Sequence, residues 1–133
     1  MKNLVQTAIA EGNFKTLIRV IQETGFVDIL SIEGPFTIFA PTDQAFAKLP
    51  KGTMEKLLKD KEKLTEILTY HVILDRVMVK QVLKIRKANT VNGKDLSINI
   101  KNGVKIDKAN IIKTDIECIN GILHIIDEVL IPK

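Results

Sequence analysis

Apolar residues recur at helical spacing through most of the first half of this chain. Over residues 4–9 and 14–21 the pattern predicts two short helices, the first with Asn3 as its N-cap and the second ended by Gly25. Three more amphipathic helical segments follow, at 45–49, 54–58 and 64–68. We therefore expect the N-terminal half to be mainly helical.

One predicted strand lies inside this helical half. Residues Phe36–Ala40 form an apolar alternating run, which is typical of a buried strand. Pro41 has no backbone N–H to donate to a sheet and closes the strand. Thr42 or Asp43 can then cap the helix over 45–49.

From Tyr70 onward the period of the apolar residues changes from helical to extended. The segment His71–Leu74 predicts a strand, whereas Val77–Ile85 fits either a strand or a helix. The later apolar runs are rich in Ile, Leu and Val, which favour strands. A final strand over 129–131 would end at Pro132.

Three Asn-Gly pairs predict hairpin turns in this second half. Each pair separates two apolar runs, and Asn-Gly is the preferred sequence of two-residue hairpin loops of type I′. The pairs are Asn92-Gly93, Asn102-Gly103 and Asn120-Gly121. Helices followed by strands favour an α+β fold over alternating βαβ units.

The length of 133 residues suits one domain, 1–133, with a single core. All six aromatic residues fall within the first 70 positions, so the core must be largely aliphatic. One cysteine, Cys118, excludes an internal disulfide and is expected to be a small buried hydrophobe. We expect no transmembrane segment, signal peptide or anchor within the chain, since no apolar run is long enough and its first residues already look helical.

Positive charge is concentrated in one segment of the chain. The net charge is +4, but between Lys80 and Lys108 eight Lys or Arg residues stand against Asp95 and Asp107, which leaves +6 there and −2 elsewhere. A basic face can attract acidic polysaccharide, anionic lipid or nucleic acid. The alternative explanation is a solvent-exposed sheet face whose lysines prevent its edges from pairing with another chain. The segment has no aromatic residue for base stacking, so we expect no nucleic-acid partner.

Few residues are candidates for catalysis or metal binding. The chain has no nucleophile elbow, phosphate-binding loop or Cys-x-x-Cys pair. Its two histidines, His71 and His124, lie in apolar segments and are interpreted as core residues, because a metal site needs three or four converging ligands. His124 and Asp127 would face opposite sides of a continuous strand. We therefore expect no catalytic residue, no metal and no cofactor.

Three segments of the chain resemble the signature segments of the fasciclin domain family, in the family's order and at about its spacing. The first is Phe36–Phe46, the second is Tyr70-His71 and the third is Asn120–Pro132. The resemblance covers nearly the whole chain and implies a wedge-like β-sandwich of about seven strands with a helical layer. It assigns a structural signature to Thr37, Phe39, Ala40, Pro41, Thr42, Asp43, Phe46, Asn120, Gly121, His124, Asp127 and Pro132.

Fasciclin domains mediate cell–cell and cell–matrix adhesion, so the resemblance implies a non-catalytic adhesion module that is extracellular or at the cell surface. In animal members, adhesion is attributed to an Asp-Ile pair before the third segment and to the Tyr-His region. The counterparts here are Asp115-Ile116 and Tyr70-His71, the latter followed by the flanking aliphatic residues Val72, Ile73 and Leu74. Both pairs also have a purely structural explanation. Because Asp115 lies close to a predicted turn, we expect an exposed carboxylate with Ile116 as an apolar contact.

The partner implied by this resemblance is a surface protein or a polysaccharide. A lone domain without a cysteine pair differs from the multi-domain animal members, which argues against an integrin, and its composition suits a small microbial member. We expect a monomer. The alternative function is a polysaccharide-acting enzyme, or an acidic-glycan-binding protein, that holds its ligand on the Lys80–Lys108 segment.

Overall fold

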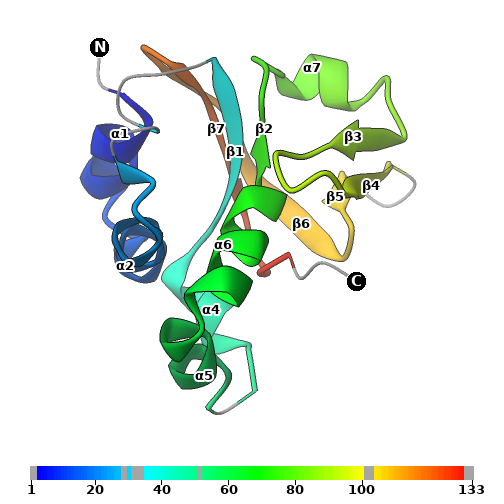
Figure 1. Ribbon diagram of the computed structural model, residues 1–133. Helices are drawn as coiled ribbons and strands as arrows, with labels where there is room; N and C mark the ends of the chain where they lie inside the picture. The colour runs from blue at the N-terminus through cyan, green and yellow to red at the C-terminus, as the bar shows by residue number, and fades with distance from the viewer. Residues whose placement is uncertain (1–2, 28–29, 31–34, 51, 101–103, 131–133) are drawn as a thin grey trace.

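The computed structural model describes residues 3–27, 30, 35–50, 52–100 and 104–130. Figure 1 shows helices gathered along one side and the lower end, with the strands between them and α7. The helices are α1 (Leu4–Glu11), α2 (Lys15–Thr24), α4 (Asp43–Ala47), α5 (Thr53–Lys59), α6 (Lys61–Tyr70) and α7 (Val79–Val82). The strands are β1 (Phe36–Pro41), β2 (Val72–Ile73), β3 (Lys87–Asn89), β4 (Asp95–Asn99), β5 (Lys105–Ile106), β6 (Ala109–Cys118) and β7 (Gly121–Ile126).

Local capping determines where the first helices begin and end, as the sequence predicts. The Asn3 side chain accepts a hydrogen bond from the backbone N–H of Gln6 at 2.8 Å, which satisfies a free donor in the first turn of α1. Gly25 ends α2 with a left-handed φ of 76°. Of the two candidate caps of α4, Thr42 is the N-cap, and its side chain accepts from the Ala45 N–H.

Within the described ranges, seven strands form one hydrogen-bonded sheet in the order β2-β1-β7-β6-β5-β4-β3. Every pairing is antiparallel except that of β1 with β7, which is parallel. The earliest strand thus lies in the interior of the sheet, beside a strand from the far end of the chain. The α+β class and the seven strands are confirmed.

Two apolar clusters form the core, one on each side of β1 and β7. The first joins α1, α2 and α6 to these strands and includes Phe14, Leu17, Ala40, Phe46, Leu68, Cys118 and Leu123. The second joins strands from both ends of the sheet order and includes Phe39, Ile73, Leu96, Ile98, Ile106 and Ile126. Since both ends contribute to one cluster, the sheet must close over itself like a sandwich. Cys118 is fully buried, as expected, and burial raises the pKa of its thiol.

The first predicted hairpin turn is wrong in type and length. Residues 90–94 join β3 to β4, and of the pair Asn92-Gly93 only Gly93 has a positive φ, whereas a type I′ turn needs two. A tertiary contact explains the longer loop. The Val91 N–H donates to the Val72 carbonyl at 2.8 Å, which fastens the loop to the edge strand β2.

The turn between β6 and β7 is also displaced by one residue from the prediction. Cys118 pairs with Gly121, so the two turn residues are Ile119 and Asn120. Gly121 is required for a different reason, because a Cβ there would collide with the backbone carbonyl of Phe36 on the parallel neighbour β1. The glycine therefore permits close strand pairing and does not form the turn.

The other strand predictions are shortened or changed. The expected strand His71–Leu74 contains only the two residues of β2, because Tyr70 still belongs to α6 and His71 is its C-cap. The ambiguous segment Val77–Ile85 contains helix α7. Residues 129 and 130 belong to no strand. Asn102-Gly103 and Pro132 lie outside the described residues.

Candidate functional site

Tyr70 is the last residue of α6, and its side chain is buried at 4% exposure. Its hydroxyl lies 2.7 Å from Oδ2 of Asp107 and 3.2 Å from the Asp95 carbonyl. Burial and the hydrogen bond to Asp107 raise the pKa of Tyr70, so the phenol stays protonated. Tyr70 thus ties the end of α6 to β4 and to the turn between β5 and β6.

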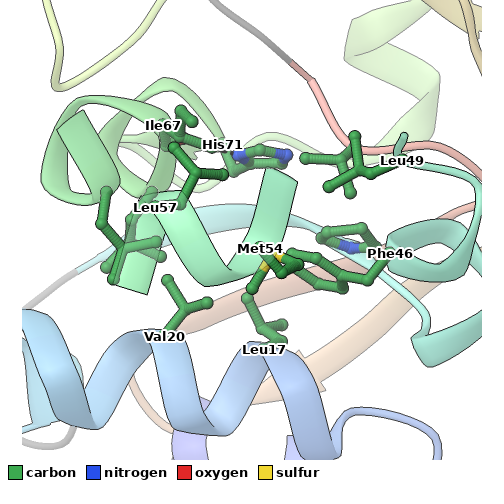
Figure 2. Close-up of a pocket in the computed structure, with 12 residues that line it drawn as sticks. Leu17, Val20, Phe46, Leu49, Met54, Leu57, Ile67 and His71 are labelled. Atoms are coloured by element: carbon green, nitrogen blue, oxygen red, sulfur yellow. Dashed lines mark hydrogen bonds between the residues drawn. The ribbon is translucent and has the colours of Figure 1, made fainter. Parts of the chain in front are cut away.

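His71 is buried and held by backbone groups on both ring nitrogens. Nε2 accepts the Leu130 N–H at 2.9 Å, so the proton sits on Nδ1, which donates to the Ile67 carbonyl at 2.7 Å. Burial lowers the pKa of His71 to about 4. Figure 2 shows the ring beside a small apolar cavity that Leu17 and Phe46 also line. At about 10 Å³ the cavity is too small for a ligand.

His124 on β7 is fully buried and stacks on Phe39, with ring centroids 5.5 Å apart. Its Nδ1 accepts the Asp115 N–H at 3.2 Å, so Nε2 carries the proton and donates to the Val77 carbonyl at 2.7 Å. Burial lowers the pKa of His124. This neutral ring therefore joins β7 to β6 and to the segment that leads into α7.

Asp115 sits at an irregularity of β6, where the pairing with β7 shifts between Lys113 and Ile116. Its φ is 56°, and its Oδ1 accepts the N–H of Val79, the first residue of α7, at 2.8 Å. The side chain is 31% exposed, and Ile116 is half-buried against the first core cluster. The carboxylate is therefore only partly exposed, because the bulge directs Asp115 towards α7.

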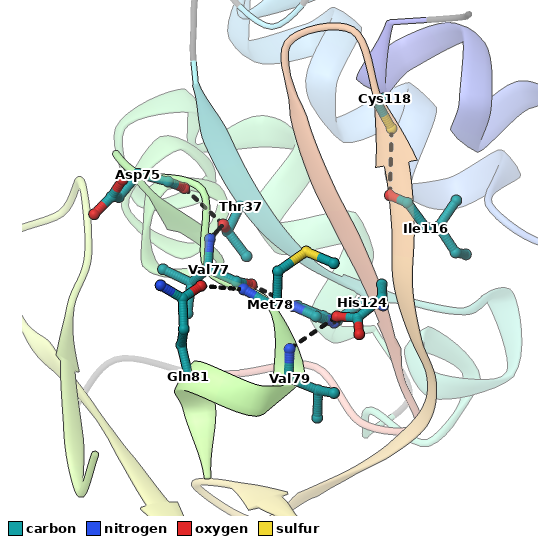
Figure 3. A network of polar contacts seen from close by, with 10 residues as sticks. Thr37, Asp75, Val77, Met78, Val79, Gln81, Ile116, Cys118 and His124 are labelled. Carbon is teal, nitrogen blue, oxygen red and sulfur yellow. Dashed lines mark hydrogen bonds and ion pairs between the residues drawn. The ribbon is translucent and has the colours of Figure 1, made fainter. Parts of the chain in front are cut away.

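Polar signature residues of the first segment connect separate elements. Thr37 is buried, and its hydroxyl donates to the Asp75 carbonyl at 2.6 Å and accepts the Val77 N–H at 2.7 Å (Figure 3). Asp43 does not cap its own helix. Its Oδ1 instead accepts the Thr16 N–H in the first turn of α2 at 2.9 Å, where the helix dipole favours a carboxylate.

Two polar residues of the third segment act in the same way. Asn120 accepts the Leu4 N–H at 3.0 Å and donates to the Leu30 carbonyl at 2.7 Å. Asp127 accepts the backbone N–H of Asn110 at 2.7 Å and its side-chain amide at 3.0 Å. Burial opposes ionisation of Asp127, but these two hydrogen bonds, together with the nearby charge of Lys48 and its own backbone N–H, lower its pKa. These polar signature residues therefore link separate elements of the fold through hydrogen bonds.

An open apolar groove of about 230 Å³ lies beside β2, next to the Tyr70-His71 pair in the sequence. Phe26, Phe36, Val72, Leu74 and Val91 are among its lining residues. Leu74 is 70% exposed, more than any other large hydrophobic residue in the described ranges. The sequence signal for this groove was the aliphatic run after Tyr70-His71. Val91 was missed because only a tertiary hydrogen bond brings it there.

The structure keeps the other predicted site residues apart from this groove. Tyr70 and His71 are buried and do not line it, and the pair Asp115-Ile116 contacts α7 and the first core cluster. In the described ranges no three His, Cys, Asp or Glu side chains gather closely enough to hold a metal ion. Within the same ranges none of the helices has the length and apolar character of a membrane span.

Comparisons with known proteins agree on one family. Residues 12–132 match the fasciclin domain. Protein sll1483 of Synechocystis sp. is 42% identical over 132 residues, which cover 97% of this chain and 73% of that protein. The uncharacterized protein sll1735 of the same organism is 39% identical, and the match covers 98% of each chain. A FAS1 domain pair from the insect cell adhesion molecule fasciclin I has a TM-score of 0.72 at 26% identity, covering 91% of this chain and 46% of that one.

Proposed function

Because this chain belongs to the fasciclin domain family, we propose that it is a non-catalytic adhesion module that binds a surface protein outside the cell or at the cell surface. A similar solved structure comes from a cell adhesion molecule, which supports this role. The observation that carries the proposal is the open groove beside β2 with Leu74 at its edge.

The chemistry of the groove supports a protein partner. Among the described residues, those that line it are hydrophobic apart from Thr69, and none of these has a titratable side chain. An exposed apolar groove of this kind can receive an aliphatic or aromatic side chain of a partner, and such contacts dominate protein interfaces. A sugar would leave most of its hydroxyl groups without hydrogen bonds there.

Tyr70 and His71 anchor the segment that leads into this groove. Both are buried, and they immediately precede the segment Val72–Leu74 in the chain. The hydrogen bond of Tyr70 to Asp107 and that of His71 to the Leu130 N–H hold the end of α6 in place. A groove fixed in this way loses little conformational entropy when a partner binds.

Asp115-Ile116 contributes to binding indirectly in this proposal. The Asp115 carboxylate holds the first N–H of α7, and Ile116 packs on the core, so the pair keeps β6 and α7 in place. Substituting Asp115 should then reduce stability more than it reduces adhesion per folded molecule.

A substitution of Leu74 by serine tests the proposed function. Leu74→Ser should lower adhesion of cells from the source organism to the immobilised protein by about five- to thirtyfold, the loss expected for one well-packed apolar contact. The melting temperature should stay within a few degrees, because the side chain is 70% exposed. Ile112→Ser is the matched control, since Ile112 is 61% exposed on β6 and does not line the groove.

Two results would contradict this proposal. Equal adhesion by wild type, Leu74→Ser and Ile112→Ser would show that the groove is not the binding face. An absence of adhesion by the folded wild-type protein would refute the adhesion function itself.

A further inference from the structure

A second groove, of about 610 Å³, runs between the connection from α7 to β3 and strand β4. It is lined by residues 83–86 and 97–100 and shares no residue with the groove beside β2. Figure 1 places α7, β3 and β4 on the side of the molecule opposite α1 and α2. The second groove therefore forms a separate surface, which the proposed adhesion function does not use.

Three large aliphatic side chains are exposed together in this groove. Leu83 is 44% exposed, Ile85 is 38% exposed and Ile100 is 53% exposed, whereas Ile98 beside them is buried in the second core cluster. Single exposed aliphatic residues are ordinary on protein surfaces, but a group of them in one groove indicates an interaction site.

Cations alternate with these aliphatic residues along the groove wall. Lys84 and Arg86 line it, and both are exposed. In the described part of the chain no carboxylate lies within ion-pair distance of either residue. The acidic residues of this basic segment are engaged elsewhere, since Asp107 accepts the Tyr70 hydroxyl and Asp95 accepts the Asn89 amide. The groove therefore has a positive, partly apolar surface.

We propose that this groove docks on an anionic lipid bilayer. A bilayer surface offers negatively charged headgroups to Lys84 and Arg86 and, just below them, hydrocarbon to Leu83 and Ile100. The long alkyl chains of the two cations allow them to reach the headgroups while the aliphatic residues enter the acyl boundary.

The other candidate ligands fit this surface less well. An acidic polysaccharide satisfies the cations but leaves the exposed aliphatic side chains facing hydroxyl groups. Among the described lining residues there is also no aromatic ring on which a sugar could stack. The cations alone do not distinguish polysaccharide from lipid. The exposed aliphatic residues favour lipid. Substituting them should weaken binding to lipid and not to polysaccharide, so these variants distinguish the two ligands.

Flotation with vesicles tests the proposal. The wild-type protein should bind vesicles of phosphatidylcholine mixed with phosphatidylglycerol, should not bind phosphatidylcholine alone, and should lose binding as salt rises. The double variant Lys84→Glu/Arg86→Glu should reduce binding at least roughly tenfold, because each cation near an anionic membrane contributes about a fivefold factor. Lys84→Gln/Arg86→Gln is a milder variant that should reduce binding in the same direction.

The aliphatic residues have their own matched variants. Leu83→Ser/Ile100→Ser should reduce vesicle binding, whereas Ile112→Ser/Ile119→Ser, which changes two exposed aliphatic residues outside the groove, should not. Melting curves confirm that each variant is folded. The proposal is overturned if both serine pairs behave alike, or if neither charge variant loses binding. It is also overturned if two results occur together. In the first, Leu83→Ser/Ile100→Ser binds vesicles as strongly as the wild type does. In the second, the wild type binds polygalacturonate as strongly as it binds vesicles.

Discussion

Replacement of Asp115 by alanine should destabilise the fold by about 2 kcal/mol, through two separate losses. Alanine at the φ of 56° lacks the local hydrogen bonding that lets Asp adopt the left-handed region, which costs about 1 kcal/mol. The Val79 N–H also loses its acceptor at 2.8 Å. We assign about 1 kcal/mol to this loss. The Asp115 side chain is 31% exposed, so water can partly replace it as the acceptor of the Val79 N–H. For a chain of 133 residues the melting temperature should fall by roughly 6–10 °C.

Two further substitutions at this position separate the two losses. Asp115→Asn keeps a side-chain acceptor and tolerates a positive φ, so it should cost under about 0.5 kcal/mol. Asp115→Gly removes the backbone strain but leaves the Val79 N–H without its acceptor, so it should fall between Asn and Ala. Urea unfolding of the four proteins in one buffer gives the free energies, and adhesion is measured per folded molecule.

Particular outcomes would refute this reasoning. A wild-type melting temperature for Asp115→Ala would show that neither the bulge geometry nor the contact with α7 contributes to stability. Equal destabilisation by Asn and Ala would show that the negative charge matters and the acceptor geometry does not. Loss of adhesion in a fully stable Asp115→Asn would show that Asp115 contacts the partner directly.

The remaining predictions concern pH and close packing. Burial lowers the pKa of His71 to about 4 and also lowers that of His124. Between about pH 6.5 and 4 the unfolded chain therefore binds more protons at His71 than the folded protein does. The stability due to its neutral ring is full above this window and is lost as pH falls, by up to about 1.4 kcal/mol per pH unit, and His124 adds a loss of the same sign. Unfolding by urea at a series of pH values measures this loss, and a flat profile would contradict it. Gly121→Ala should cost about 3 kcal/mol or more, because its Cβ meets the Phe36 carbonyl, whereas Gly93→Ala meets no neighbour and should cost only about 1–2 kcal/mol for its positive φ. Equal losses in urea unfolding would show that close strand pairing is not what requires Gly121.

Features that depend on neighbours in the chain could be predicted from the sequence. Asn3 caps α1 through a residue three positions away, and Gly25 ends α2 through its own backbone conformation. Thr42 caps α4 in the same local way. Apolar periodicity located the helices of the first half and the buried strand β1, because the period of a helix or strand is visible within about ten residues, but it left the segment of α7 ambiguous.

The candidate site was only partly predictable. The resemblance to fasciclin domains pointed to Tyr70-His71 and to the aliphatic residues after them, and Leu74 does lie at the edge of a groove. The apolar segment around His71 predicted its burial, which is confirmed. The sequence could not show the hydrogen-bond partners of Tyr70 and His71, because Asp107 and Leu130 lie far along the chain. Nor could it show that the groove includes Val91.

Sequence alone thus determined the helix caps, the apolar faces and the α+β class, all of which follow from interactions within a few residues. The tertiary structure alone decided that β1 pairs with β7, that Val91 is bound to Val72, and that a bulge directs Asp115 towards α7. The physical reason is the range of the contacts. A turn or a strand end is altered when a distant backbone group supplies a hydrogen bond. Local propensities are under about 1 kcal/mol per residue, so such a tertiary hydrogen bond can override them.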